Sequence, residues 1–191
     1  MEEAEALSTK MGIMVKGGVF RCFGSSQHIK NKYGTGYEIE VKIKKLTPED
    51  VTRMAHQWGF DKQPTDSDMV PLQAILDRMR ERGVDAFLQS EVRLGGLGED
   101  LVKEASEEGN NGMVSYHNFL VWLYVEQAGM SIVNGLCEQF PSVEILEHYS
   151  DYYKLRIPRG DKSIGFVFGY IESCKEQFQI SEYSVSQTTL E

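Results

Sequence analysis

The chain has 191 residues, of which 41% are hydrophobic and 26% charged, a composition typical of a soluble globular protein with one large or two small domains. Its 29 acidic and 20 basic side chains give a net charge of −9, which argues against a protein that binds nucleic acid through the phosphate backbone. No apolar run approaches the roughly 18 residues of a membrane span, and no signal-peptide pattern opens the chain, so direct membrane insertion is not expected.

The first elements expected are a helix and a hairpin. Residues 2–9 have helix-like composition, and two short apolar runs follow at residues 11–15 and 19–23. Between these runs lie Gly17 and Gly18, and glycines in that position are typical of the turn of a β-hairpin.

A short helix and a strand come next. Gly24 and Ser25 mark a helix entry in which Ser25 is the N-cap, and Gly34 ends the helix. Residues 37–44 alternate apolar and charged side chains, as a half-buried strand does.

The middle of the chain differs in charge from its two ends. Residues 46–129 carry 15 acidic and 7 basic side chains, whereas residues 1–45 carry 5 and 8. We therefore expect 46–129 to be a separate, mostly helical, acidic insertion.

After the insertion the pattern of alternating elements resumes. Apolar spacing predicts helices over residues 130–140 and 163–177, and strands over 143–148, 152–157 and 180–185. Together with the strand at 37–44 the order is βαββαβ. We therefore expect an α+β fold in which a ferredoxin-like antiparallel sheet is preceded by an N-terminal helix and hairpin.

One loop of the insertion resembles either a degenerate calcium site or an unrelated glycine turn between two helices. When residues 107–118 are aligned with an EF-hand loop, Gly112 falls at the sharp turn. The candidate oxygen ligands would be Glu107, Asn111, Ser115 and Asn118. Position three of the loop is a glycine and position twelve is Asn118, which offers no bidentate carboxylate, so physiological calcium binding is not expected.

Catalytic motifs are not apparent in the sequence. It contains no Gly-Lys pair and therefore no Walker A loop. The four histidines have no metal-ligand spacing, and the three cysteines form no C-x-x-C pair and are read as reduced thiols. We expect no catalytic residues, no cofactor and no metal ligands beyond the weak loop described above.

Both ends of the chain resemble one protein family. The N-terminal motifs are Met-Glu-Glu-Ala-Glu-Ala-Leu at 1–7, Gly-Ile-Met-Val-Lys-Gly-Gly at 12–18 and Arg-Cys-Phe-Gly-Ser-Ser-Gln-His-Ile-Lys at 21–30. They resemble the close of the nucleotide-binding domain of A-subfamily ABC transporters. The stretch Tyr-Ser-Val-Ser-Gln-Thr-Thr-Leu-Glu at 183–191 is similar to the segment that closes the regulatory domain following that ATPase domain.

The resemblance implies an organisation for the whole chain. Residues 1–36 would be the C-terminal remnant of an ABC nucleotide-binding domain, and residues 37–45 with 130–191 a ferredoxin-like regulatory domain. In the family, the Walker motifs, the signature motif and the H-loop all precede this region, so the chain is expected to be a fragment. Its motif residues would have structural roles, namely Gly17, Gly18, Gly24, Ser25, Tyr183, Val185 and Gln187.

The function implied is that of a non-catalytic regulatory segment of a lipid-exporter-like transporter. It would contact the parent's ATPase domains, which bind ATP and Mg²⁺, on the cytoplasmic side of a membrane, and it would be soluble if expressed alone. The alternative is a free-standing ligand-sensing or calcium-sensing interaction module.

Overall fold

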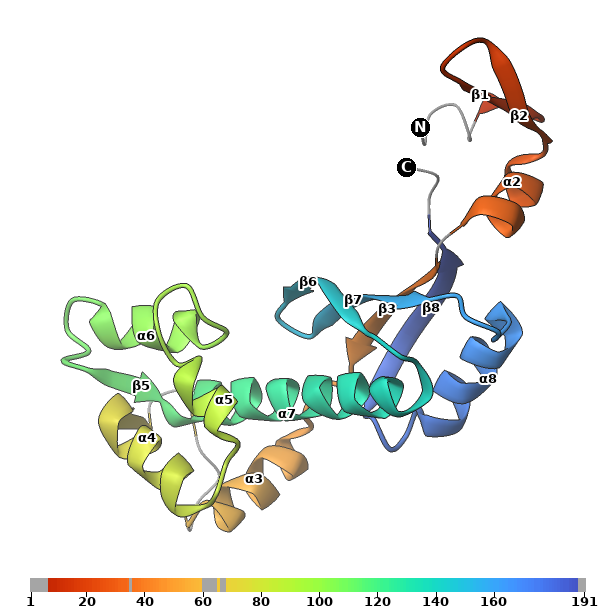
Figure 1. Ribbon diagram of the computed structural model, residues 1–191. Coiled ribbons are helices and arrows are strands. Elements are labelled where there is room, and N and C mark those ends of the chain that lie inside the picture. Colours follow the sequence, from red (N-terminus) through yellow and green to blue (C-terminus); the bar gives the residue numbers. More distant parts are fainter. Residues whose placement is uncertain (1–6, 35, 60–64, 66–67, 189–191) are drawn as a thin grey trace. The chain divides into compact units, whose positions relative to one another are not determined.

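The computed structural model describes residues 7–34, 36–59, 65 and 68–188. The chain divides into two compact units (Figure 1). The first, here called the sheet unit, consists of residues 1–44 and 131–191, and the second, the helical unit, of residues 45–130. The second boundary falls inside one helix, α7 (Tyr116–Gln139).

The sheet unit begins with a β-hairpin and a short helix. Strands β1 (Met11–Val15) and β2 (Val19–Gly24) pair antiparallel, as the sequence predicts. The expected helix at 2–9 lies largely outside the described residues. Residues 8–10 are not helical, because Ser8 and Thr9 favour turns and caps over helix interiors and β1 starts directly after them.

Helix α2 (Ser26–Tyr33) then leads to the main sheet. Ser25 caps α2 by accepting a hydrogen bond from the His28 N–H, and Gly34 closes its end, in agreement with the sequence. The sheet has four strands in the order β6–β7–β3–β8, and each neighbouring pair is antiparallel. Its members are β3 (Gly36–Ile43), β6 (Glu144–Tyr149), β7 (Tyr152–Pro158) and β8 (Ile180–Gln187).

Alternation along the strands determines which face of the sheet is buried. In β3 the odd-numbered residues from 37 to 43 are buried, and the even-numbered residues are only partly covered. Helices α7 and α8 (Ile164–Cys174) contribute Ile132, Leu136, Val167 and Ile171 to the same core. The opposite face carries paired charges, such as Arg156 beside Glu38.

The helical unit consists of short helices and one very small sheet. Its elements are α3 (Pro48–Gln57), β4 (Met69–Pro71), α4 (Leu72–Glu81), α5 (Ala86–Ser90), α6 (Glu99–Ser106), β5 (Met113–Ser115) and the first part of α7. Strands β4 and β5 pair antiparallel with Val70 opposite Val114. The core gathers around Phe119, Leu120 and Leu123 of α7.

The sequence placed the start of α7 incorrectly. A helix was expected over 130–140, yet α7 starts at Tyr116 and passes through Gly129 before it ends at Gln139. Residues 119–125 are apolar almost without interruption. A helix buried on several sides lacks the one-sided stripe that reveals a surface helix.

Candidate functional site

A glutamate of α6 bonds across the loop between α6 and α7. The Glu104 carboxylate of α6 accepts hydrogen bonds from the Ser115 N–H at 2.7 Å and from the Asn118 side-chain amide at 3.1 Å. Ser115 is buried, and its hydroxyl oxygen accepts from the Asn118 N–H. A carboxylate of the protein itself therefore ties together two of the four positions predicted as calcium ligands.

The other two predicted ligands lie apart from this network. Glu107 is exposed at the end of α6, and Asn111 is exposed with a left-handed backbone, φ 51°. Gly112, with φ 80°, makes the sharp turn expected of it. Within the described residues no group of three or more His, Cys, Asp or Glu side chains could hold a metal ion.

A second helix–strand–helix segment is paired with this one through its short strand. The chain runs from α3 through β4 into α4, just as it runs from α6 through β5 into α7, and β4 pairs with β5. The Leu72 N–H at the start of α4 donates to the Gly112 carbonyl. From the sequence, a partner for the first loop could lie within residues 47–82, but the aspartates grouped there fit no calcium-loop spacing. The strand itself, Met69–Pro71, is too short to give a periodic signal.

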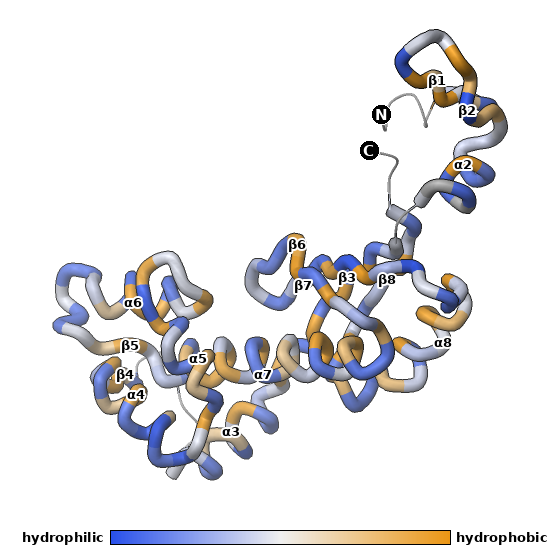
Figure 2. The backbone as a smooth tube through the Cα atoms, viewed as in Figure 1, coloured by the Kyte–Doolittle hydropathy of each residue, from blue (hydrophilic) through white to orange (hydrophobic). Residues whose placement is uncertain are grey.

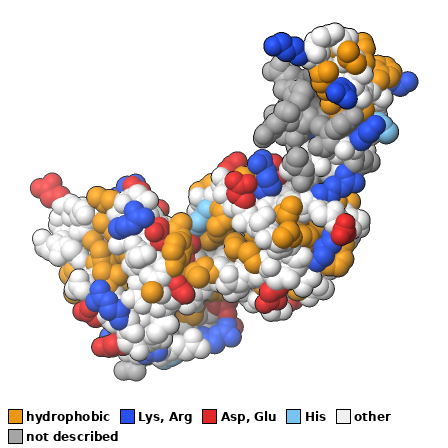
Figure 3. All heavy atoms as spheres, in the orientation of Figure 1, with side chains coloured by type: hydrophobic (Ala, Val, Ile, Leu, Met, Phe, Trp, Pro, Cys, Tyr) orange, Lys and Arg blue, Asp and Glu red, His pale blue; other side chains and the backbone are white. Residues whose placement is uncertain are grey.

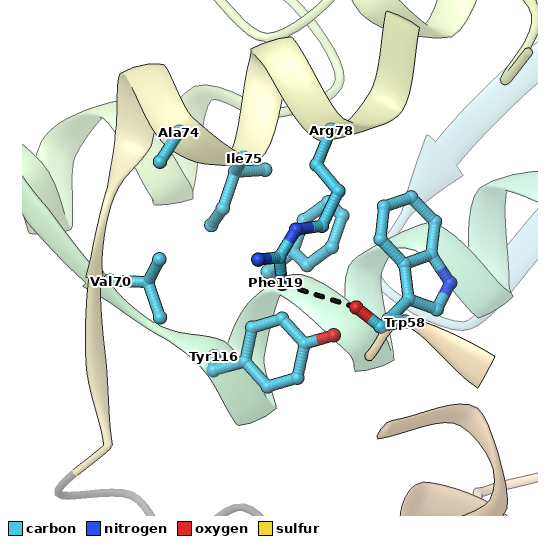
Figure 4. A pocket seen from close by; sticks show the side chains of 7 residues that line it. All are labelled: Trp58, Val70, Ala74, Ile75, Arg78, Tyr116 and Phe119. Atoms are coloured by element: carbon cyan, nitrogen blue, oxygen red, sulfur yellow. Dashed lines mark hydrogen bonds between the residues drawn. The ribbon is translucent and has the colours of Figure 1, made fainter. Parts of the chain in front are cut away.

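A small cavity lies beside this strand pair (Figure 4). Its volume is about 10 Å³, enough for about one water molecule and far below the space that a small-molecule ligand needs. The lining residues are Trp58, Val70, Ala74, Ile75, Arg78, Tyr116 and Phe119.

Two polar side chains enter this cavity. Arg78 Nη1 donates to the Trp58 carbonyl at 3.1 Å. Burial raises the pKa of the Tyr116 phenol, while the nearby Arg78 and Arg82 charges act in the opposite direction. The cavity is therefore a packing feature of the helical core and not a ligand site.

The hairpin formed by β1 and β2 carries several exposed apolar side chains. Hydrophobic residues lie along both of its strands (Figure 2), and the space-filling view shows hydrophobic side chains at the surface there (Figure 3). Phe20 and Phe23 are 62% and 67% exposed. We call the following residues the hairpin surface: Met14, Val15, Val19, Phe20 and Phe23. An isolated two-stranded hairpin is marginally stable, and contiguous exposed apolar side chains mark contact surfaces.

The structural motif residues lie in turns, caps and the last strand. Gly17 and Gly18 have φ of 102° and 76° in the hairpin turn, a left-handed backbone that glycine adopts without strain. A side chain on Gly24 would press on the His28 ring, and Ser25 is the cap of α2.

The closing strand β8 is tied both to α8 and to α2. The Tyr183 hydroxyl donates to Glu172 Oε2 of α8 at 2.6 Å, and this bond raises the pKa of Tyr183. Val185 is buried, and Gln187 Oε1 accepts from Gln27 Nε2 at 2.9 Å. The Gln27 to Gln187 bond joins the N-terminal and C-terminal motifs, which lie 160 residues apart in the sequence.

Comparison with known proteins relates this chain to transporters. An alignment that is 193 residues long and covers the whole of this chain gives 26% identity to the human phospholipid-transporting ATPase ABCA3. Over 50 residues, 26% of its length, this chain is 56% identical to the human retinal-specific phospholipid-transporting ATPase ABCA4. Over 45 residues, 24% of this chain, it is 56% identical to ABC transporter A family member 5 of Dictyostelium discoideum.

The chain spans only 7%, 2% and 3% of the lengths of these three relatives. It is thus related to the A-subfamily ABC transporters, as its terminal motifs predict. Residues 117–187, from the first turn of α7 to the end of β8, match the model of the ABCA1-like C-terminal R1 regulatory domain. Among the described helices, none has both the length and the apolar character needed to cross a bilayer.

Proposed function

We propose that this chain is a non-catalytic regulatory segment of an ATP-driven, lipid-transporting protein of the A subfamily. It acts on the cytoplasmic side of the membrane by contacting ATPase domains, which bind ATP and Mg²⁺. The match of residues 117–187 to a regulatory-domain family and the phospholipid-transporting names of two relatives support this function.

The architecture of the sheet unit supports a regulatory domain of the ferredoxin-like kind, formed by residues 37–45 and 130–191. Its elements run β3, α7, β6, β7, α8, β8, and the last strand lies beside the first. This order supports the split βαβ arrangement, in which a helix connects two strands that run in the same direction but are not neighbours in the sheet. The helical unit is then an insertion in the first of those connections.

The exposure of the hairpin surface is the observation that best supports a contact with an ATPase domain. Its phenylalanines are more than half exposed, and Lys16 lies in the turn between the two strands. Apolar side chains surrounded by polar ones are typical of a protein–protein contact. We assign residues 1–36 to the end of an ATPase domain, so the hairpin surface packs against the remainder of that domain.

Lysine cross-linking in membranes that contain the whole protein tests this assignment. We expect cross-links from Lys10 or Lys16 to an ATP-binding domain. The double variant Phe20→Glu with Phe23→Glu is expected to abolish them, because it places charges in an apolar contact. Leu94→Glu is the matched control, since Leu94 is 65% exposed but belongs to the helical unit. Cross-links that survive the double variant, or that never involve an ATP-binding domain, would contradict the proposal.

A second candidate function is a calcium-sensing or ligand-sensing module. The observation that favours it is the pairing of two helix–strand–helix units through β4 and β5, which resembles a degenerate EF-hand pair. The Glu104 network weighs against calcium, because this carboxylate accepts hydrogen bonds from the Ser115 N–H and the Asn118 side-chain amide instead of facing an ion.

A further inference from the structure

Strand β8 is an edge strand that lacks the usual protection of an edge. In the described chain its only strand neighbour is β3. The Thr188 N–H bonds to the Gly36 carbonyl, directly opposite it. In an antiparallel ladder, residues that bond to the neighbouring strand alternate with residues that do not. Counting back from Thr188, the backbone N–H and C=O groups of Tyr183 and Val185 therefore point away from β3. Glu182 is the only charged residue of β8, which contains no lysine, arginine or proline, and such an edge is open to pairing.

The other edge of the sheet is built differently. Strand β6 has a register irregularity between Ile145 and Glu147. It also carries the carboxylates of Glu144 and Glu147. A bulge and outward charges are the devices by which proteins prevent edge pairing. In β8 the irregularity falls at Ser181, next to the start of the strand, and residues 182–187 pair regularly.

The helix beside β8 also exposes an apolar face. Helix α8 has no charged residue before Glu172. Its exposed side carries Gly165 and Gly169, with open space around Gly169, and Phe168 is 40% exposed. The Phe168 and Tyr183 rings lie 6.0 Å apart, which makes the exposed face of α8 continuous with β8.

We propose that β8 and the exposed face of α8 form a two-fold symmetric interface between two copies of this chain. Two β8 strands pair antiparallel with Ser184 on the axis, so that Tyr183 faces Val185 of the second copy. Aromatic and β-branched side chains form a favourable cross-strand pair. The sheets join into one, and the glycines of α8 let the two helices approach closely.

The sequence of β8 suits a second copy of itself. In the register centred on Ser184, Glu182 of one copy lies opposite Ser186 of the other. The two Glu182 carboxylates therefore do not face each other. The hydrogen-bonding pattern also fits. The backbone N–H and C=O groups of Tyr183 that point away from β3 would bond to those of Val185 in the second copy. A self-complementary patch of this kind defines a closed two-fold contact.

Sedimentation analysis of the full chain over a wide concentration range tests the interface. We expect a reversible dimer. Ser184→Lys places two like charges opposite each other on the axis and is expected to weaken the dimer roughly tenfold or more. It should not disturb the fold, since Ser184 is exposed and lies beside Glu40. Ser184→Ala is the matched control and should dimerise like the parent chain.

Two further experiments separate the interface from a general folding defect. Gly169→Leu fills the open space on α8 and should also give monomers, with an unchanged circular dichroism spectrum and unfolding midpoint. Mixing the Ser184→Lys and Ser184→Glu chains should restore a heterodimer, because opposite charges then face each other. A monomeric parent chain, or a dimer unaffected by both Ser184→Lys and Gly169→Leu, would overturn the proposal. If the parent chain is monomeric, a strand that pairs with the β8 edge would have to come from a different protein.

Discussion

The Glu104 side chain bonds to two residues at the end of the loop that follows α6. Replacing it by alanine leaves the buried Ser115 amide without its carboxylate acceptor. We expect a loss of about 1–3 kcal/mol in the free energy of unfolding, the usual cost of a buried donor left unsatisfied. Urea unfolding measures it, and Glu108→Ala, at an exposed position of the same loop, serves as the control. Equal stability of the two variants would show that Glu104 is dispensable.

Calcium should have no effect on this loop. Gly109 offers no side-chain ligand, and Asn118 cannot supply the bidentate carboxylate that a calcium loop has at its last position. At roughly 10⁻⁷ to 10⁻⁵ M, the range of calcium sensors, we expect amide NMR spectra with and without the ion to coincide. Shifts centred on residues 107–118 would favour the sensing function instead.

Local signals at single residues were predictable, and contacts across a loop were not. The Ser25 cap and the turn at Gly17 and Gly18 follow from the sequence because each depends on its immediate neighbours. Glu104 bonds to residues 11 and 14 positions further along the chain. No periodicity marks such a partner, so the sequence directed attention to Glu107 and Asn111 instead.

At the scale of elements, α7 and α8 meet at a glycine. The Tyr170 hydroxyl of α8 donates to the Gly135 carbonyl of α7 at 2.7 Å, and a methyl group on Gly135 would overlap the Phe178 ring. Gly135→Ala is therefore expected to destabilise the sheet unit by about 1–3 kcal/mol, the typical cost of overpacking. This outweighs the gain of up to about 1 kcal/mol in helix propensity.

Thermal unfolding of Gly135→Ala beside Asn134→Ala makes the comparison, because Asn134 is exposed on the same turn of α7. Phe178→Leu in the Gly135→Ala background should recover part of the loss, since the smaller side chain makes room for the methyl group. A neutral Gly135→Ala variant would mean that the Phe178 ring moves aside freely.

Elements with a single buried face were predicted well, and the element without one was not. Strand β3 alternates strictly, so its period of two identifies both the strand and its buried side. In α7, residues 119–125 are all apolar and all at least partly buried, so no one-sided stripe marks the helix in the sequence. The pairing of β4 with β5 depends on two three-residue strands 44 positions apart, too short for any periodic signal.

At the scale of the whole molecule, the helical unit should be removable. Replacing residues 46–129 by a short Gly/Ser linker retains the buried Ile132 and Leu136 of α7. We expect a cooperative unfolding transition, because loop length enters stability only logarithmically, about 0.6 kcal/mol per doubling. Both tryptophans, Trp58 and Trp122, lie in the removed segment, so circular dichroism is the appropriate measurement. Loss of cooperativity would contradict the proposed division into two modules.

ATP should not bind to the chain by itself. The sequence contains no Gly-Lys pair with which a phosphate-binding loop could be made. Calorimetric titration with ATP and Mg²⁺ is expected to show no saturable heat, and no phosphate should be released. Micromolar affinity that depends on Mg²⁺ would show that residues outside the known motifs hold the nucleotide.

The irregularity in β6 has a consequence for assembly size. A sheet with two open edges could add copies at both ends and grow into a fibre. Here the carboxylates of Glu144 and Glu147 and the register shift beside Ile145 close one edge. Once two chains have joined through β8, both outer edges of the combined sheet are β6 strands. Polymerisation therefore stops at two chains, and a variant of β6 with a regular register and no carboxylates would be the one at risk of forming filaments.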